Sequence, residues 1–427
     1  MDLKKVIDQV RNERVFRNFF SLGILQFTNY LVPLITIPYL LRTIGVVNFG
    51  QVSLAQAIIS YFIIITEYGF NLTATREVSI EKDNSTNVST IFSNTITTQA
   101  LLSLLSFACL IVLVYTIPFF ISQRILFLNS FLLVIGQILV MSWFFQGIER
   151  MKFITCLNLI SKSLLLILII AFIKKPDDYI YVPLFYASGN ILSGLISLWI
   201  IAKKFHVKYR APQLRIIVKK LQDGFPVFIS SLSVSAYINS NLIILGLFTS
   251  EINIGLYSAA EKIMQVVRQL LIVFSQSIYP RICLLAQISH DQVKQFLKTF
   301  FLPFSILIIS GCLIVGIFSD NIATILIGYH SSTASILIKI LIISPAVVCF
   351  NIPFYQTLLA YDFRKKYMTV ILMGAIVNII LNFILASYFG PVGTAITVVA
   401  TEVFVTFGLA FSLERLGSRY SLLNLIK

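Results

Sequence analysis

Residues Thr299–Phe318 read TFFLPFSILIISGCLIVGIF and contain no charged side chain. A helix needs about 20 apolar residues to cross the roughly 30 Å hydrocarbon core of a bilayer. The composition of the whole chain agrees, because 57% of its 427 residues are hydrophobic and only 12% are charged. Soluble proteins contain roughly a quarter charged residues. The sequence therefore predicts an all-α integral membrane protein.

Stretches of this kind recur along the chain and predict twelve transmembrane helices. The 33 Lys and Arg residues give the orientation, because the cytoplasmic connections of membrane proteins are enriched in them. With the N-terminus in the cytoplasm, and with residues within two positions of a span end counted with the adjoining connection, 25 of them lie in cytoplasmic segments, 4 lie outside and 4 lie within spans. Both termini are therefore expected in the cytoplasm. The predicted spans are 18–42, 47–70, 91–117, 125–146, 154–173, 181–202, 224–248, 255–282, 296–318, 334–359, 367–388 and 391–413.

The longest connection between predicted spans covers residues 203–223 and contains seven Lys or Arg residues. From Leu214 onward its apolar residues share one helical face, with Arg215, Lys219 and Lys220 opposite. This pattern is typical of a helix that lies in the membrane interface. We therefore predict three parts, which are an N-terminal six-helix lobe (1–202), a basic amphipathic cytoplasmic connector (203–223) and a C-terminal six-helix lobe (224–427).

The two predicted lobes share short sequence matches. The segment NFGQVSLAQ from Asn48 matches NIGLYSAAE from Asn253 at an offset of 205, and FFQ ending at Gln146 matches FYQ ending at Gln356 at an offset of 210. Two matches in register with the hydropathy pattern indicate a duplication. Because six spans are an even number, the lobes are expected to have the same orientation about a pseudo-two-fold axis along the membrane normal.

The four cations within the spans, together with Arg42 at the end of the first span, are candidates for a substrate site. A lipid-facing Lys or Arg at mid-span costs about 2.5–3.5 kcal/mol, so such residues are expected to face a watery interior. Lys162 and Arg268 fall at similar depths in the inner half of their spans, Lys262 lies one turn further out than Arg268, and Lys339 and Arg42 lie towards the outside. A ladder of cations around a central cleft suits a diphosphate group, which Arg can contact with two parallel hydrogen bonds.

Each of these cations also has a structural interpretation. Arg268 could form a structural pair with Glu261 or Glu402 without any part in binding, although Glu261 lies two turns away on the same helix, about 10 Å, which is too far for a close pair. The lysines could extend their long side chains towards the membrane surface. Arg42 could simply mark the end of the first helix. These alternatives remain open from the sequence.

Uncharged polar residues and acids complete the set of candidates. Polar stripes that include Asn29, Gln56 and Asn239 favour a water-filled passage between the lobes, although hydrogen bonds between helices explain many such residues. A buried carboxylate near a cation can exchange a proton or hold sodium, so intramembrane acids are candidates for ion coupling. Balancing the charge of nearby cations is the alternative role. The three candidate coupling residues are Glu67, Glu261 and Glu402.

Several other classes of function are disfavoured by the composition. Three histidines and five scattered cysteines give little material for a zinc site or a histidine-based catalytic centre, and no cofactor is expected. The net charge of +15 fits the positive-inside pattern and contacts with anionic membrane lipids better than nucleic-acid binding. The predicted outer connections are short and offer no nucleophile–base pair, which argues against a membrane polysaccharide polymerase or ligase.

Five stretches together resemble the polysaccharide-unit (O-antigen, Wzx-type) flippases of the multidrug/oligosaccharidyl-lipid/polysaccharide exporter superfamily. They follow the family order and touch most of the chain. One departure is that the predicted span 334–359 ends without the Gly-Ile-Glu that follows Gln146 in the predicted span 125–146. The stretches are ITIPYLLRTIG with FG in Ile35–Gly50, EYGFNLTATR at Glu67–Arg76, WFFQGIERM at Trp143–Met151, NIGLYSAAEKI to YPRI in Asn253–Ile282, and NIILN with GPVGTAITVVATE in Asn378–Glu402.

The resemblance implies two six-helix lobes around a central cleft and an alternating-access cycle in the bacterial cytoplasmic (inner) membrane. The implied substrate is an isoprenoid-diphosphate-linked oligosaccharide, moved from the inner to the outer leaflet for polysaccharide or lipopolysaccharide synthesis. Polysaccharide polymerase and chain-length proteins are expected partners. The alternative within the superfamily is an antiporter of drugs or organic cations, but the excess of intramembrane cations favours an anionic substrate.

Overall fold

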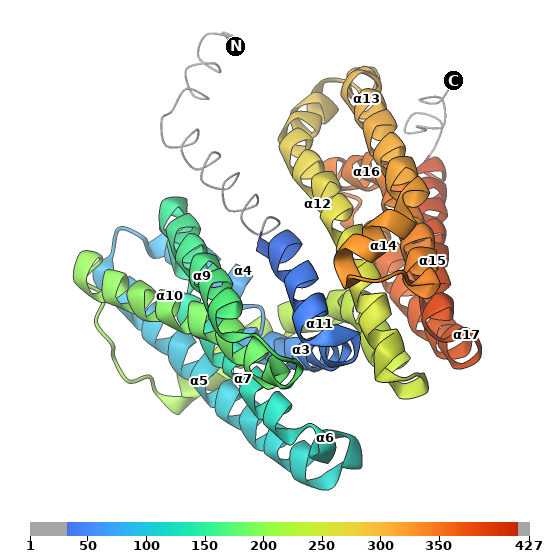
Figure 1. The fold of residues 1–427 in the computed structure, drawn as a ribbon. Coiled ribbons are helices and arrows are strands. Elements are labelled where there is room, and N and C mark those ends of the chain that lie inside the picture. Colours follow the sequence, from blue (N-terminus) through green and yellow to red (C-terminus); the bar gives the residue numbers. More distant parts are fainter. Residues whose placement is uncertain (1–31, 417–427) are drawn as a thin grey trace. The chain divides into compact units, whose positions relative to one another are not determined.

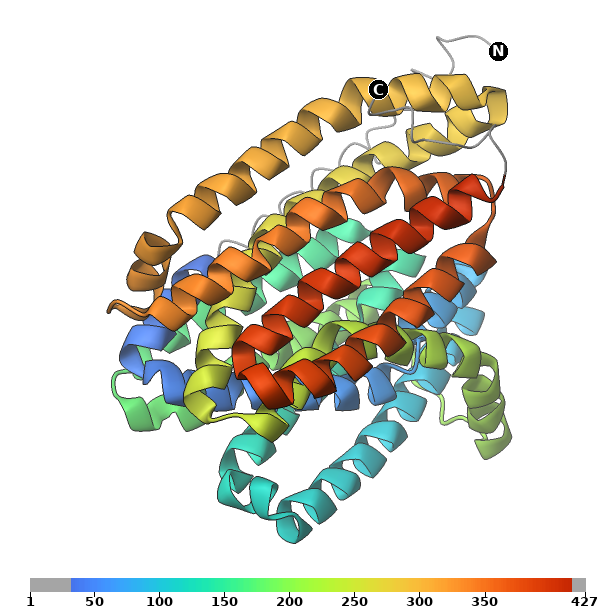
Figure 2. The same cartoon turned by 90° about the vertical axis from the view of Figure 1, so that its right-hand side faces the viewer.

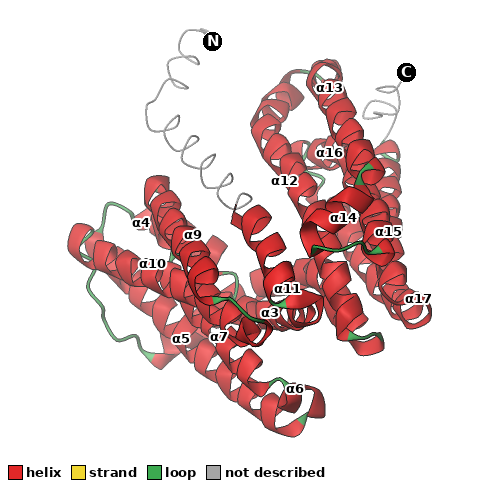
Figure 3. Cartoon of the chain, in the orientation of Figure 1, coloured by secondary structure: helices red, strands yellow, loops and turns green. Residues whose placement is uncertain are grey.

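The computed structural model describes residues 32–416, and within that range the regular elements are helices (Figures 1 and 3). Residues 32–43 are helical and precede the labelled elements. These are α3 (Gly45–Glu67), α4 (Phe70–Glu81), α5 (Ser85–Thr116), α6 (Pro118–Ser122), α7 (Arg124–Val140), α8 (Ser142–Gly147), α9 (Met151–Phe172), η1 (Pro176–Tyr181), α10 (Val182–Lys204), α11 (Leu214–Phe248), α12 (Glu251–Ile288), α13 (His290–Ile317), α14 (Ser319–Ile327), α15 (Ser332–Leu341), α16 (Ile343–Ala360) and α17 (Arg364–Glu414).

The helices follow the predicted spans, and several spans are interrupted. In the described part of the chain, nine helical stretches are long and apolar enough to cross a membrane. The span predicted at 125–146 consists of α7 and α8, and the one at 334–359 consists of α15 and α16. The last two spans form α17, whose backbone is non-helical at Gly390 (φ 55°). Most of the first span, 18–42, lies outside the described residues.

The second predicted span, 47–70, lies in a helical stretch that is long and apolar enough to cross a membrane, and the backbone turns within it, just after Glu67. Tyr68 and Gly69 both have positive φ angles, 46° and 76°, and they separate α3 from α4. Glycine adopts this left-handed conformation without steric cost, which makes Gly69 suitable for the turn. The Tyr68 N–H closes α3 by donating to the Ile64 carbonyl at 2.9 Å. The two helices therefore change direction at a point that hydropathy does not reveal.

The described chain forms two compact units. The first contains residues 32–44 and 55–232, and the second contains residues 45–54 and 233–416. The predicted connector belongs to the first unit, and the first turns of α3 belong to the second. The predicted lobe boundaries at 202 and 224 describe the order of the spans and stay a prediction.

Each unit has its own apolar core. In the first, Trp143, Phe144 and Phe145 of the short helix α8 are nearly fully buried and pack with Phe70 and Phe92. In the second, helices α12, α13, α15, α16 and α17 pack against one another (Figure 2). Burying large aromatic and aliphatic side chains between helices fixes the positions of the polar residues that the same helices carry.

The repeated motif packs against its own copy inside the second unit. The Ser258 hydroxyl donates to the Ser53 Oγ at 2.8 Å, and these two residues occupy equivalent positions 205 apart. Gly50 likewise lies against its equivalent, since a Cβ added to Gly50 would lie 2.7 Å from the Gly255 nitrogen. Contacts between equivalent residues are expected where two surfaces related by a two-fold axis meet. This contact supports the duplication inferred from the sequence.

We expect Gly255→Ala to lower the free energy of unfolding by about 1–3 kcal/mol, the usual cost of overpacking a tight contact. A Cβ at Gly255 would overlap the backbone carbonyl oxygen of Val46, and backbone cannot rotate away as a side chain can. Gly311→Ala in α13 is the matched control, because nothing lies within 4 Å of its added Cβ. Thermal unfolding of both variants in detergent measures the difference. Equal midpoints would contradict the tight α3–α12 contact.

Candidate functional site

An ion pair between two long helices lies at the centre of the candidate site in the second unit. Arg268 of α12 donates from Nη2 to Oε1 of Glu402 in α17 at 2.6 Å. The side chain of Glu402 is 3% exposed and that of Arg268 is 27% exposed. Glu402 lies twelve residues beyond the break at Gly390, which is about 18 Å along a helix, and it is the middle residue of the predicted span 391–413. A buried carboxylate therefore holds a partly exposed arginine at mid-depth.

Of the two glutamates that the sequence names as structural partners of Arg268, the structure pairs it with Glu402, the one that is not on the same helix. Glu261 lies two turns before Arg268 on the same helix, about 10 Å away along the axis. It is half-buried. The selected pair is thus formed between helices, at a separation of 134 residues in the chain.

Polar residues around this pair mostly bond between helices. Asn378 donates to the Thr401 hydroxyl at 3.3 Å, which joins the two helical parts of α17 on either side of Gly390. Asn382 donates to the Asn241 Oδ1 of α11 at 3.1 Å. The Thr406 hydroxyl contacts Asn351 of α16. Asn378 and Asn382 therefore join helical segments by hydrogen bonds, which is the alternative to lining a water-filled passage. These bonds tie α17 to α11 and α16 next to Glu402.

The other candidate residues of the second unit have local contacts. Lys262 donates to Gln265 at 3.4 Å, and Asn239 donates to Ser235 at 2.9 Å. Lys339 pairs at 3.4 Å with Asp320 of α14, and both side chains are 49% exposed. The hydroxyl of Ser335, with Lys339, lowers the pKa of the Asp320 carboxyl below its ordinary value. The structure thus does not bring Lys339 to the Arg268–Glu402 pair.

The remaining candidates belong to the first unit. Glu67 at the end of α3 accepts a hydrogen bond from Gln137 of α7 at 2.8 Å. Lys162 of α9 and Gln56 of α3 are half-buried, and Arg42 is exposed at the end of the helix 32–43. Asn29 lies outside the described residues. The predicted binding and coupling roles of these residues stay predictions.

Sequence reasoning missed three polar partners. Gln137 and Asp320 gave no signal, because their contacts with Glu67 and Lys339 depend on how separate helices pack. The third is Glu77 of α4, which pairs at 2.9 Å with Lys220 of the connector. The expectation that Lys220 lies on the outward face of the connector helix is wrong, since its side chain is 8% exposed.

The buried side of the connector helix differs from the predicted one for a physical reason. Ile217 is buried there, whereas Leu214 and Val218 are 72% and 46% exposed. An ion pair and a hydroxyl partner compensate for burying a lysine. The helix therefore turns Ile217 and Lys220 towards the first unit.

Comparisons with known sequences place these features in context. The family model described as "Polysaccharide biosynthesis protein" matches residues 15–286, more than half of the chain. The chain is also similar to the "Putative O-antigen transporter" of Escherichia coli (strain K12), with 29% identity over 391 residues that cover 91% of this chain and 94% of that protein.

Solved structures share the fold. The structure of the lipid II flippase MurJ in an inward closed conformation superposes with a TM-score of 0.72 at 16% identity, covering 94% of this chain and 87% of that one. An inward-facing multidrug resistance MATE family transporter of the MOP superfamily gives a TM-score of 0.59 at 12% identity, covering 90% and 98%. These likenesses confirm the predicted class, an all-α membrane protein with a transporter fold.

Proposed function

Because the chain belongs to the polysaccharide biosynthesis protein family, we propose that it is a flippase for isoprenoid-diphosphate-linked oligosaccharides. It moves O-antigen or other surface-polysaccharide units from the inner to the outer leaflet of the bacterial cytoplasmic membrane by alternating access. The name of the Escherichia coli relative and the fold shared with a lipid II flippase support a substrate of this class. Polymerase and chain-length proteins would then receive the units on the outer side.

The observation that carries the proposal is the ion pair of Arg268 and Glu402. The part of such a substrate that crosses the membrane with most difficulty is the diphosphate, which is anionic and strongly hydrated. A guanidinium group has five N–H donors in a planar fork that fits phosphate oxygens. Glu402 holds this fork at mid-depth, and the 27% exposure of the Arg268 side chain lets a phosphate reach it.

Glu402 also has a role in the proposal when no substrate is bound. A guanidinium without a counterion is costly at this depth, and the carboxylate balances it. A diphosphate that binds to Arg268 competes with Glu402 for the same donors. The affinity for substrate is thereby kept moderate, so that release on the other side of the membrane remains fast.

Ion coupling through an intramembrane acid belongs to the proposal as well. Glu402 is engaged with Arg268, and Glu67 accepts from Gln137. Glu261 lies on the same helix as Arg268 and nearer its outer start, where an entering or leaving diphosphate would change the local charge. We therefore assign the coupling role first to Glu261.

The second candidate function is an antiporter of organic cations, which the likeness to a MATE family transporter favours. Such a substrate needs an available carboxylate in the passage. Of the two candidate acids in the second unit, Glu402 is already paired with an arginine, and Glu261 shares its helix with Lys262 and Arg268. An anionic substrate therefore fits this site better than a cationic one.

A cellular experiment tests the proposed function against this alternative. In a bacterium whose own flippase gene is deleted, lipid-linked units should accumulate in the inner leaflet, and expression of this protein should restore glycan at the surface. Resistance to organic cations should not change. Resistance to organic cations without restored surface glycan would favour the antiporter function and contradict the proposed flippase function.

We expect both chain termini on the cytoplasmic side, because Lys and Arg divide so unevenly between the predicted connections. A reporter fused after Lys427, or within 203–222, should give a cytoplasmic signal. A reporter at Asp177 should give an external signal. An external signal at either of the first two positions would contradict the twelve-span topology.

A further inference from the structure

The connector between the predicted lobes runs along one face of α5 in the first unit. Hydroxyl oxygens of α5 accept hydrogen bonds from backbone N–H groups of the connector. The Lys208 N–H donates to Ser89 Oγ at 3.1 Å, and the Arg210 N–H donates to Ser93 Oγ at 2.9 Å. One turn further, the Thr97 hydroxyl and the Tyr209 hydroxyl lie 2.9 Å apart. The connector is thus attached through its backbone as well as through side chains.

The spacing of these bonds follows from ordinary geometry. Positions four apart on a helix are separated by about 6 Å along its axis. Alternate N–H groups of an extended chain point the same way and are roughly 6.6 Å apart. The Ser89 and Ser93 hydroxyls each donate to a carbonyl of their own helix at 2.7 Å, which leaves their oxygens to accept. A row of hydroxyls on α5 therefore matches a chain segment laid along it.

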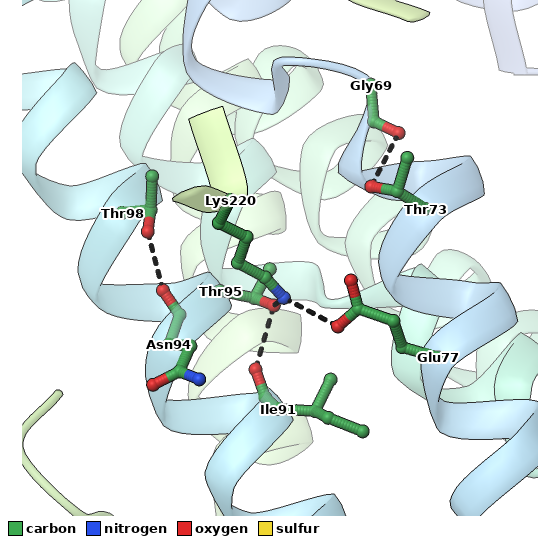
Figure 4. A network of polar contacts seen from close by, with 8 residues as sticks. All are labelled: Gly69, Thr73, Glu77, Ile91, Asn94, Thr95, Thr98 and Lys220. Carbon is green, nitrogen blue, oxygen red and sulfur yellow. Dashed lines mark hydrogen bonds and ion pairs between the residues drawn. The ribbon is translucent and has the colours of Figure 1, made fainter. Parts of the chain in front are cut away.

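A buried lysine makes the second attachment (Figure 4). Lys220 Nζ lies 2.9 Å from Glu77 Oε2 and 2.7 Å from Thr95 Oγ1, and 5.8 Å from the centre of the Phe70 ring. Burial lowers the pKa of Lys220, and the Glu77 carboxylate opposes that shift. Glu77 is 42% exposed, whereas Lys220 is 8% exposed and Thr95 is fully buried. Removing either partner would leave the buried ammonium less well compensated, so the attachment resists undocking.

The attachment continues into α11. Gly224 packs against the Tyr68 side chain and Val227 packs against Gly69. The rings of Phe228 and Tyr68 are stacked, with centroids 4.6 Å apart and planes 6° apart. Residues up to 232 belong to the first unit, and residues from 233 onward belong to the second. One helix, α11, thus carries the chain from one unit to the other without a break.

We propose that residues 205–228 are an arm that stays docked on the first unit throughout the transport cycle, with Lys220 as the positioning residue. The hydroxyls of α5 hold its first half, and Glu77 with Thr95 holds the start of α11. Any change in α11 during transport then occurs beyond Phe228. The inference rests on the proposed function, because it assumes that α11 must adjust during a cycle of alternating access.

Covalent docking tests the arm directly. Thr97→Cys and Tyr209→Cys are introduced into a chain without its five native cysteines, and a short bifunctional thiol reagent joins them in proteoliposomes. We expect efficient crosslinking with and without an isoprenoid-diphosphate oligosaccharide, and transport within two-fold of the uncrosslinked protein. A loss of more than ten-fold on crosslinking, or the absence of a crosslink, would overturn permanent docking.

Lys220→Met tests the positioning role. We expect at least a ten-fold loss of transport and a lower crosslinking yield, at normal protein level. Crosslinking the Cys pair in this variant should restore transport, because the covalent bond replaces the lost attachment. Lys219→Met is the matched control, because Lys219 is the neighbouring lysine and is exposed, and this variant should transport like the parent protein.

Two outcomes separate a positioning role from a folding role and from failure of the proposed function. If crosslinking does not restore transport in Lys220→Met, Lys220 is not a positioning residue. If that variant does not insert into the membrane, Thr95→Val is used instead, because it removes only the hydroxyl partner of Lys220. It should show a smaller loss of transport and of crosslinking yield, and crosslinking should again restore transport. If the parent protein transports no lipid-linked oligosaccharide, the proposed function fails, while the crosslinking yield still reports on docking.

Discussion

Arg268→Ala should abolish export of the lipid-linked oligosaccharide, with at least a hundred-fold loss. The change removes the fork that we assign to the diphosphate. Arg268→Lys should recover only part of the activity, because an ammonium is a point charge and cannot make two parallel bonds to phosphate. Arg281→Ala is the control on the same helix, since Arg281 is exposed, and it should export normally. Surface glycan per unit of protein in the membrane is the measurement.

A paired substitution separates binding from stability at this position. Arg268→Ala alone leaves Glu402 buried without its counterion, and breaking a buried pair in this way typically costs about 3–5 kcal/mol. Adding Glu402→Gln removes the uncompensated charge and should restore the protein level. It should not restore export, because the phosphate still lacks its arginine. Recovery of both level and export in the double variant would show that the pair is only structural.

Glu261→Gln should uncouple export from the ion gradient while substrate still binds. An amide has nearly the shape of the carboxyl group but can neither release nor take up a proton, so the gradient can no longer drive the cycle through this position. Flux with and without an imposed gradient, measured beside substrate binding, gives the result. Glu251→Gln is the control, because this acid is exposed at the start of the same helix.

The competing account of Glu261 makes a different prediction. If the carboxylate only balances Lys262 and Arg268, its loss lowers the protein level and leaves gradient-driven flux per molecule unchanged. Gradient-driven flux at the parent rate in Glu261→Gln would therefore remove this residue from the coupling mechanism. Glu67 and Glu402 would then be tested in the same way.

The positions of the spans could be predicted because hydropathy reports directly on the cost of burying side chains in lipid. The breaks within the spans could not. At Tyr68 and Met141 the backbone has positive φ angles, and neither residue type favours this conformation, so the sequence does not predict the turn. The repeat at Asn48 and Asn253 predicted the duplication, but not that Gly50 and Gly255 pack against each other.

The candidate site was predictable in its residues and less so in its contacts. Composition singled out Arg268 as a costly mid-membrane cation and offered Glu402 as one of two partners. Helix spacing disfavoured the other partner, Glu261, but only the packing of α12 against α17 shows that Arg268 and Glu402 meet. For Lys220 the amphipathic pattern pointed the wrong way, because it treats every lysine as a group that faces water. Its partner, Glu77, lies 143 residues earlier in the chain.

The central claim is that this chain moves an isoprenoid-diphosphate-linked oligosaccharide across a membrane, and reconstitution tests it most directly. Purified protein is placed in liposomes that carry a fluorescent substrate of this class in both leaflets, and a membrane-impermeant quencher reports the accessible fraction over time. The account predicts that the protected fraction becomes accessible with the parent protein and stays protected with Arg268→Ala. Translocation no faster than in protein-free liposomes, or equally fast with Arg268→Ala, would contradict it.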